Sequence, residues 1–417
     1  MTNYLLYIDP GTGSMLFSIL IGAATTLFFL GKALWIKLKV IFSGKKGNVA
    51  ADLSLKNYVI YNEGNQYWNV FKPVCDEFEK RQIELTYYTS AQKDPCFDQG
   101  YKFVKPEFIG EGNMAFAKLN MLSANFVLMT TPGLQVYQLK RSRNVRHYGH
   151  VLHAPSDATM YRLFGIDYFD SILLSGEYQK DDIRKLEAQR NLPAKELITV
   201  GCPYLDTLKE KIASIPEETN HQFTVLVSPS WGPSALLSKY GEKLLDPLIK
   251  TGWRIIVRPH PQSKKSEKDM LDALTEKYKN TANLEWDYQR DNIYAMKKSD
   301  IMISDFSGII YDYTFLCDKP VMYVNASLDL RPYDAYDLNG GKDIWQFKTL
   351  EKIGIELKEE QFENIGDVIK SASDSKELAD LRHTAKAQAW TNEGKAGQAI
   401  ADYMIKTVTT KTTKMGE

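Results

Sequence analysis

Cysteine is scarce and scattered in this 417-residue chain. The four cysteines form no C-x-x-C pair, and no histidine stands at metal-ligand spacing from them; they are Cys75, Cys96, Cys202 and Cys317. This pattern argues against a structural zinc site and against a disulfide framework. Four isolated thiols suit a reducing cytoplasm. We therefore expect no metal site and no cofactor.

The chain also lacks an excess of charge of one sign. It has 52 Lys and Arg residues and 52 Asp and Glu residues, so its formal net charge is zero. Proteins that bind nucleic acids usually carry more basic than acidic residues, so we expect no nucleic-acid partner. Fixed-period repeats and low-complexity tracts are missing as well, and no nucleophile elbow is visible, which makes a plain hydrolase the weaker interpretation.

One long uncharged run stands near the N-terminus. No charged residue occurs between Gly11 and Gly31, a length that suffices to cross the hydrocarbon core as a helix. Asp9 precedes the run, and five lysines between Lys32 and Lys46 follow it. A cleaved signal peptide carries its positive charge before the run, which is the reverse order. The positive-inside rule then predicts a single-pass transmembrane helix in the plasma membrane, with the rest of the chain in the cytoplasm. The alternative is a buried helix of a soluble domain.

After a short linker, apolar runs of strand length alternate with helical patterns. Such alternation predicts βαβ units and parallel sheets. Expected strands are 58–61, 83–88, 125–129, 171–174 and 197–200, and then 223–227, 253–257, 301–303 and 321–324. We predict an α/β chain with two doubly wound domains facing each other across a cleft. The expected parts are a membrane anchor and linker (1–51), an N-terminal domain (52–216), a C-terminal domain (217–390), and a final helix and tail (391–417).

Three loops that follow expected strands of the second domain carry residues suited to phosphate. They are Ser228-Pro229-Ser230-Trp231-Gly232, Arg258-Pro259-His260-Pro261 and Ser304-Asp305-Phe306-Ser307-Gly308. Ligands of doubly wound sheets bind beyond the carboxyl ends of the strands, so the loops should meet at one rim. Arg258 offers a fork of donors, and the helix expected after Ser307 offers free backbone N–H groups. A pyrophosphate would find all of these together.

Plainer interpretations exist for each of these loops. Arg258 and His260 could belong to a structural turn, with the guanidinium paired to a carboxylate. Ser304, Asp305 and Ser307 could be ordinary helix caps. The coincidence of three such loops at adjacent strand ends favours the binding site.

The first domain has one cluster of histidines, at His147, His150 and His153. In a strand, His147 and His153 would share one face, and His150 would lie on the other. His153 would stand at the strand end and face the cleft, where a neutral imidazole could take a proton from a hydroxyl. Asp157 could orient its ring. The alternatives are strand packing or a metal site, and His150 is better read as structural.

The three loops together resemble the CDP-glycerol glycerophosphotransferase family, the teichoic acid primases and polymerases. Arg258-Pro259-His260-Pro261 resembles its R-P-H-P loop, Val227-Ser228-Pro229-Ser230-Trp231 its A-P-T-W loop, and 303–312 its S-D-[YF]-S-S-[IV]-x-x-D stretch. In the first domain the family has W-H-G-T-P-x-K. The matching stretch here is Leu152-His153-Ala154-Pro155-Ser156-Asp157, which keeps the His but not the Trp, the Gly, the Thr or the Lys of that motif.

The resemblance implies a GT-B-like fold, with the donor held by the second domain and the acceptor by the first. It implies His153 as the base and His260 as a catalytic residue that stabilises phosphate charge. The implied substrate-binding residues are Arg258, Ser230, Trp231, Asp157, Ser304, Asp305, Ser307, Gly308 and Asp312, the last as a support for its loop. The implied reaction moves glycerol phosphate from CDP-glycerol, or a related CDP-polyol, to a lipid-linked saccharide at the membrane. Alternatives are another nucleotide-sugar transferase or epimerase of the same fold, or a nucleotide-binding membrane protein that has lost catalysis.

Overall fold

The computed structural model describes residues 54–413 except 290, 327, 343 and 374, together with 25, 27 and 31. The expected transmembrane run, 11–31, therefore lies almost wholly outside the described residues. Among the residues that are described, no helix is both long and apolar enough to cross a membrane. The described residues from Leu55 onward form one compact unit.

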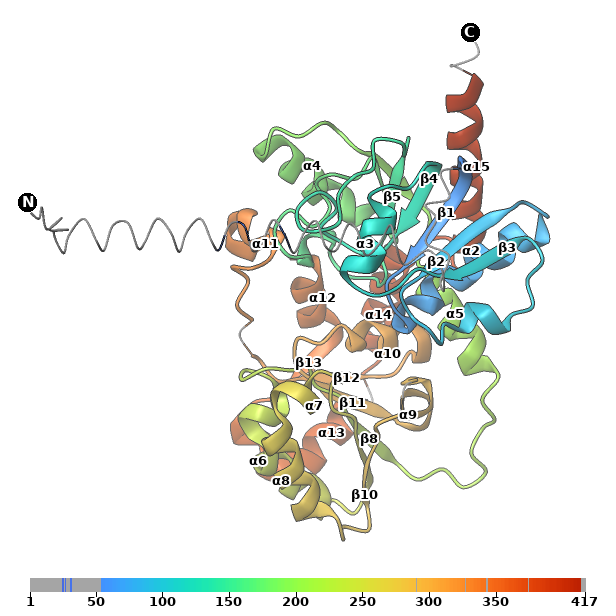
Figure 1. Cartoon of the computed structure of the whole chain (residues 1–417). Helices are drawn as coiled ribbons and strands as arrows, with labels where there is room; N and C mark the ends of the chain where they lie inside the picture. The colour runs from blue at the N-terminus through green and yellow to red at the C-terminus, as the bar shows by residue number, and fades with distance from the viewer. Residues whose placement is uncertain are drawn as a thin grey trace, which may run out of the picture. The chain divides into compact units, whose positions relative to one another are not determined.

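Two parallel sheets make up this unit, as the alternating pattern predicts (Figure 1). The first sheet has seven strands in the order β3-β2-β1-β4-β5-β6-β7. Their bounds are β1 (Lys56–Asn62), β2 (Leu85–Thr89), β3 (Val104–Phe108), β4 (Ala124–Met129), β5 (Tyr148–Val151), β6 (Ser171–Leu174) and β7 (Glu196–Thr199). The order reverses between β1 and β4, so the topological switch point, where such sheets bind ligands, lies there.

The second sheet has six strands in the order β10-β9-β8-β11-β12-β13, all parallel. Their bounds are β8 (Thr224–Val227), β9 (Arg254–Val257), β10 (Leu284–Trp286), β11 (Ile301–Ser304), β12 (Val321–Tyr323) and β13 (Gly354–Glu356). Here the order reverses between β8 and β11. The three phosphate-type loops follow β8, β9 and β11, so they gather around this second switch point.

Helices cover both faces of each sheet, which explains why the central strands are apolar on both sides. On the first sheet, α2 (Trp68–Lys80) and α15 (Ala396–Thr413) share one buried cluster, and α3 (Asn113–Leu119) and α4 (Lys180–Gln189) share the other. On the second sheet, α6 (Leu236–Lys250), α8 (Lys268–Tyr278) and α13 (Ile365–Ser373) cover one face. The other face is covered by α5 (Pro203–Ala213), α9 (Ile293–Lys298) and α10 (Ile309–Cys317).

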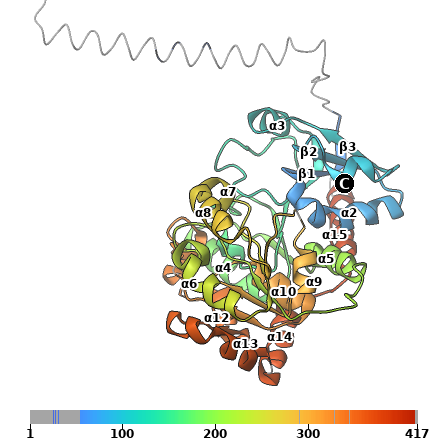
Figure 2. The same cartoon turned by 90° about the horizontal axis from the view of Figure 1, so that it is seen from below.

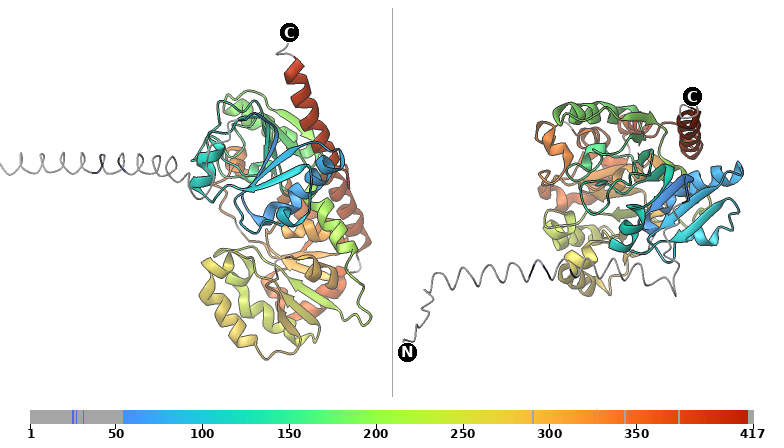
Figure 3. Two further views of the ribbon diagram at one scale, coloured as in Figure 1. Left: turned by 45° about the vertical axis from the view of Figure 1, so that its right-hand side comes forward. Right: turned by 45° about the horizontal axis from the view of Figure 1, so that its top comes forward.

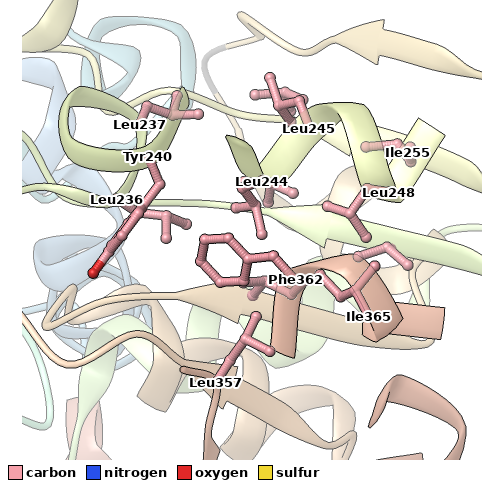
Figure 4. Close-up of a cluster of buried hydrophobic side chains, with 14 of the residues drawn as sticks. Leu236, Leu237, Tyr240, Leu244, Leu245, Leu248, Ile255, Leu357, Phe362 and Ile365 are labelled. Carbon is pink, nitrogen blue, oxygen red and sulfur yellow. The ribbon is translucent and has the colours of Figure 1, made fainter. Parts of the chain in front are cut away.

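The core under α6 shows why its sequence becomes a helix. Leucines at 236, 237, 244, 245 and 248 repeat with helical spacing and are all buried. Figure 4 shows Leu244 and Leu248 beside Phe362 and Ile365, which come from the chain after β13. Tyr240 packs edge-on against the Phe362 ring, with centroids 5.2 Å apart. The last part of the second half is thereby fixed to its first helix.

The final helix returns to the first sheet. After α14 (Lys376–Ala389), which packs beside α10 and α12 (Trp345–Ile353), the chain crosses back and α15 lies along α2 (Figures 1 and 2). In both views of Figure 3 the red helix α15 lies beside the blue elements at the start of the described chain. Ile400, Ala401, Met404 and Val408 are buried in the same cluster as the α2 side chains. The first sheet is therefore completed by the last helix of the chain.

A second connection joins the two halves through the chain after β12. Tyr333 pairs with Arg162 in an antiparallel bridge, and the Asp334 carboxylate accepts a hydrogen bond from the Phe164 backbone N–H at 2.7 Å. Arg190 of the first half donates to this carboxylate at 2.6 Å. Asp334 is fully buried. A buried ion pair therefore sits where the two halves meet.

Candidate functional site

A cavity of about 570 Å³ opens at the switch point of the second sheet. Arg258, His260 and Ser307 all line it, so the structure brings these three predicted residues together. The opposite wall comes from the first half, with Asn65, Gln66 and Asn69 around the start of α2. We call this space the first cavity; the further residues around it include Tyr204, Ser228, Lys264, Asp287, Tyr288 and Asn292.

The Arg258 side chain is fixed by its neighbours. Its guanidinium donates to the Asp287 carboxylate at 2.6 Å and to the Gln289 carbonyl at 2.8 Å. Both Arg258 and Asp287 side chains are 11% exposed. The plainer interpretation, a guanidinium paired with a carboxylate, is thus correct for Arg258. The residue nevertheless lines the cavity, held in place by this pair.

His260 presents a hydrogen-bond donor to the first cavity. Its Nδ1 accepts from the Gln262 backbone N–H at 3.1 Å. A ring that accepts at Nδ1 carries its proton on Nε2 when it is neutral. Burial lowers the pKa of His260, although Glu267 and Asp305 oppose that effect. At neutral pH the ring therefore carries an Nε2–H group that is able to donate a hydrogen bond.

The loop before α10 is shaped by one buried carboxylate. Asp305 accepts from the backbone N–H groups of Ser230 at 2.9 Å, Leu236 at 2.9 Å and Ser307 at 3.1 Å. It is 1% exposed, and Ser304 beside it is fully buried and donates to the Ser228 carbonyl at 2.6 Å. The prediction that Asp305 and Ser304 bind substrate is therefore wrong. They hold two of the three loops in register because every group they offer is used inside the protein.

The other predicted residues of these loops differ in where they lie relative to the first cavity. Gly308 stands at the N-terminus of α10, directly after Ser307. Trp231 is 46% exposed, and its ring lies 6.3 Å from the His260 ring, so it flanks the cavity without lining it. Ser230 is buried at the same bend. Lys264 and Tyr288, by contrast, line the cavity, and the Lys264 ammonium lies 4.2 Å from the Tyr288 ring centre.

Asp157 and Asp312 support the structure. Asp157 accepts from the backbone N–H groups of Trp345 at 3.3 Å and Gln346 at 2.8 Å, at the start of α12. It does not touch His153, so its predicted roles in orienting that ring and in binding substrate are wrong. Asp312 accepts from the Tyr204 hydroxyl at 3.0 Å and is also buried, which agrees with a supporting role for its loop.

Asp312 allows a direct test of this supporting role. Burial raises its pKa to about 7, against a hydrogen bond from Tyr204 that lowers it. A pKa above the unfolded value means that stability falls as pH rises from about 4 to about 7. Asp312→Asn keeps an acceptor for Tyr204 without a charge. We expect it to raise the free energy of unfolding by roughly 2–3 kcal/mol more at about pH 8 than at about pH 5, measured by urea unfolding, because about two pKa units separate pH 5 from the folded pKa. A variant that is less stable than the wild type at the higher pH, or equally affected at both pH values, would contradict this assignment.

His153 lies in a different cavity. Its Nδ1 is 3.0 Å from the Tyr161 hydroxyl, and its ring packs edge-on against Tyr67 at 5.3 Å. Burial lowers its pKa to about 4. The cavity that it lines, of about 340 Å³, includes Glu63 but none of the loop residues of the second half discussed above. We call this the second cavity. The expectation that His153 faces the phosphate-type loops directly is wrong.

The two other histidines of the cluster are structural. The His147 ring stacks on Phe126 and its Nε2 lies 2.9 Å from the Ser171 hydroxyl. His150 is fully buried between Tyr161 and Phe169, and burial lowers its pKa to about 3. In the described part of the chain, no three His, Cys, Asp or Glu side chains come close enough together to hold a metal ion.

Comparisons with known proteins agree with this architecture. Residues 168–338 match the sequence model of the family described as CDP-glycerol:poly(glycerophosphate) glycerophosphotransferase, which confirms the resemblance seen in the loops. Among solved structures, the wall teichoic acid polymerase TagF soaked with CDPG is similar, with a TM-score of 0.55 at 15% identity. That match covers 94% of this chain and 98% of the other.

The same fold occurs in epimerases. UDP-GlcNAc 2-epimerase from Methanocaldococcus jannaschii, in complex with UDP-GlcNAc and UDP, matches with a TM-score of 0.54 at 13% identity, over 85% of this chain and 100% of the other. The enzyme from Neisseria meningitidis bound to UDP-GlcNAc matches with a TM-score of 0.54 at 13% identity, over 84% and 100%. No curated protein matches the sequence. These likenesses establish the GT-B-like fold.

Proposed function

Since the chain resembles the CDP-glycerol glycerophosphotransferases in sequence over residues 168–338 and in fold, we propose that it transfers glycerol phosphate, or a related polyol phosphate, from a CDP-linked donor to a hydroxyl group. The observation that carries this proposal is the first cavity, where Arg258, His260, Ser307 and the start of α10 converge on one space. A diphosphate placed there meets donors from His260, Ser307 and the start of α10, beside an Arg258 that is held by Asp287.

The chemistry of the transfer follows from these donors. The glycerol-side phosphorus is attacked by the acceptor oxygen, and CMP leaves. Charge is spread over the phosphate oxygens in the transition state, so positioned donors supply most of the stabilisation. The Nε2–H of His260 and the backbone N–H groups at the start of α10 are such donors. Arg258, paired with Asp287, fixes the loop that carries His260.

The acceptor that we propose is a lipid-linked saccharide at the inner face of the plasma membrane. The uncharged run between Gly11 and Gly31, with lysines only after it, supports an anchor that leaves the catalytic part in the cytoplasm. An enzyme tethered in this way meets a lipid-linked acceptor at the bilayer surface.

The experiment is a comparison of donors with the full-length chain and a membrane lipid extract as the acceptor source. We expect CMP release from CDP-glycerol or CDP-ribitol, and neither UDP release from UDP-GlcNAc nor its conversion into another sugar nucleotide. The likeness to UDP-GlcNAc 2-epimerases makes the sugar nucleotide the natural competitor. Turnover of UDP-GlcNAc alone would replace the proposal by a sugar-nucleotide enzyme. Binding of CDP-glycerol without CMP release would indicate a protein that has lost catalysis.

A further inference from the structure

One long stretch of the first half contains no acidic residue. From Gly112 through Ser156 there is neither Asp nor Glu, although at the chain's average of 52 acidic residues in 417 a stretch of this length would hold about six. The same stretch has five basic residues, which are Lys118, Lys140, Arg141, Arg143 and Arg146. The zero net charge of the whole chain therefore conceals a local basic excess.

The fold brings two parts of this stretch together at the edge of the first sheet where its strands begin. Asn120, at the end of α3, donates through its side-chain amide to the Gln138 carbonyl at 3.1 Å and accepts from the Lys140 backbone N–H at 2.8 Å. The Ser142 hydroxyl donates to the Leu122 carbonyl at 2.6 Å. Residues 138–146 therefore lie along the end of α3 and the start of β4.

Basic and apolar side chains are exposed together at this edge. Arg143 and Arg146 are exposed, and among the described residues neither is paired with a carboxylate. Met121 is 44% exposed, and so is 42% of Tyr168, whose carbonyl accepts a hydrogen bond from Arg141. The carboxylate of Asp170 beside them is already bound by Arg141 at 2.9 Å. We call this surface the basic face; it consists of Met121, Lys140, Arg143, Arg146 and Tyr168.

The compact unit begins at the same edge. At the start of β1, the Lys56 backbone N–H donates to the Ser123 carbonyl at 3.1 Å, two residues after Met121. Leu55, just before it, is 52% exposed. The proposed anchor, 11–31, precedes this point by residues 32–54, which span at most roughly 80 Å. An anchor in the membrane is therefore joined to the rest of the protein next to the basic face.

An anionic lipid surface matches both kinds of side chain on the basic face. The cytoplasmic leaflet carries anionic lipids, which attract Lys and Arg residues that lie close to the membrane. Exposed Met121 and Tyr168 can enter the boundary between head groups and acyl chains, where tyrosine is enriched. A soluble polyanion would use the charges of the face and leave these two side chains in water.

We propose that the basic face docks on the anionic cytoplasmic leaflet, as a second membrane contact in addition to the anchor. This inference goes beyond the proposed function and does not depend on which group the protein transfers. A single anchoring helix joined through residues 32–54 leaves the orientation of the compact unit open. Docking of the basic face fixes that orientation, because it turns the edge where the strands of the first sheet begin toward the bilayer.

The test measures amide hydrogen exchange of the full-length chain in vesicles of phosphatidylcholine, alone or mixed with an equal part of phosphatidylglycerol. We expect exchange over 118–124 and 138–146 to be slower in the anionic vesicles, and exchange over α8 to be the same in both. One Lys or Arg near an anionic surface strengthens binding about five-fold. The triple variant Lys140→Gln/Arg143→Gln/Arg146→Gln should therefore lower the ratio of docked to undocked protein about 100-fold and abolish the slowing.

Two further variants make the result specific to the basic face. Lys243→Gln/Lys268→Gln/Lys279→Gln is the matched control, since it removes as many charges from exposed lysines of α6 and α8, and it should keep the slowing. Arg143→Gln alone should lower the docking ratio about five-fold at the wild-type Tm, which keeps the test valid if the triple variant is less stable.

Three outcomes would overturn the inference. Exchange over 118–124 and 138–146 could be equal in the two kinds of vesicle. The slowing could survive in the triple variant, so that other residues make the contact. Polyuridylate added to neutral vesicles could slow exchange where anionic vesicles do not, which would assign the face to nucleic acid. None of these measurements uses CMP release, so failure of the proposed function leaves the test intact.

Discussion

Replacing His260 by alanine should lower the rate of CMP release from CDP-glycerol by about 100- to 1,000-fold, which is the typical loss when one positioned donor to a developing negative charge is removed. The ring lines the first cavity and, because Nδ1 accepts from the Gln262 backbone, it presents Nε2–H. The hydrogen bond from His260 stabilises the phosphate charge more in the transition state than in bound CDP-glycerol. The effect should therefore appear mainly in kcat rather than in the affinity for CDP-glycerol.

Two further measurements make this prediction decisive. Tm should stay at the wild-type value, because the ring is only partly buried and is linked to the protein by a single local hydrogen bond. His383→Ala is the matched control, since His383 is exposed, pairs with Asp318 and lines neither cavity. Normal turnover by a well-folded His260→Ala protein would remove His260 from the mechanism and with it the main support for the phosphate site.

Replacing Arg190 by alanine should destabilise the protein by about 3–5 kcal/mol, the usual result of removing one partner of a buried ion pair. The guanidinium donates to Asp167 at 2.8 Å, Asp334 at 2.6 Å and Asp337 at 2.7 Å. Its side chain is 9% exposed, while those of Asp167 and Asp334 are 5% and 0% exposed. Without it, two carboxylates would stay buried with no cation.

This loss should depend on pH in a defined direction. Burial raises the pKa of Asp334 to about 6 even though Arg190 lowers it, so the folded state binds this proton more tightly than the unfolded state. Stability from this group therefore falls as pH rises from about 4 through the folded pKa. Removing Arg190 raises that pKa further. The penalty should thus be larger at about pH 8 than at about pH 5, where the carboxyl can protonate.

Urea unfolding at the two pH values measures the effect. Arg331→Ala is the control, because Arg331 is 75% exposed and pairs only with nearby Asp329 in the described part of the chain. A loss below about 1 kcal/mol, or one equal at both pH values, would mean that the pair adds nothing beyond an exposed ion pair.

The sequence predicts the fold well where strands are apolar and regularly spaced. The central strands β1, β4, β8, β9 and β11 are buried on both faces, so each reads as a continuous apolar run. The outer strands are harder to recognise. β3 contains a proline and is mostly exposed, and β10 and β13 have three residues each. Their strand structure comes from pairing with a neighbour, which no local pattern reveals.

The sequence predicts which residues after strands come together, but it does not reveal their partners from distant segments. Arg258, His260 and Ser307 follow β9 and β11, and the switch-point rule brings them together. The same rule could have placed Glu63 at the second cavity, since it directly follows β1. Asp305 and Asp157 were mistaken for ligand-binding residues because a carboxylate that accepts backbone N–H groups looks the same in sequence as one that binds substrate.

The return of α15 to the first sheet affects the order in which the molecule can be completed. Domains usually fold one after another as the chain leaves the ribosome. Here the cluster around α2 lacks Ile400, Ala401 and Met404 until the chain has been synthesised through α15. The apolar side chains of α2 that pack on α15 therefore stay uncovered while the second sheet forms. Nascent chains that stop before Ala396 present these side chains to chaperones and proteases, whichever substrate the finished protein binds.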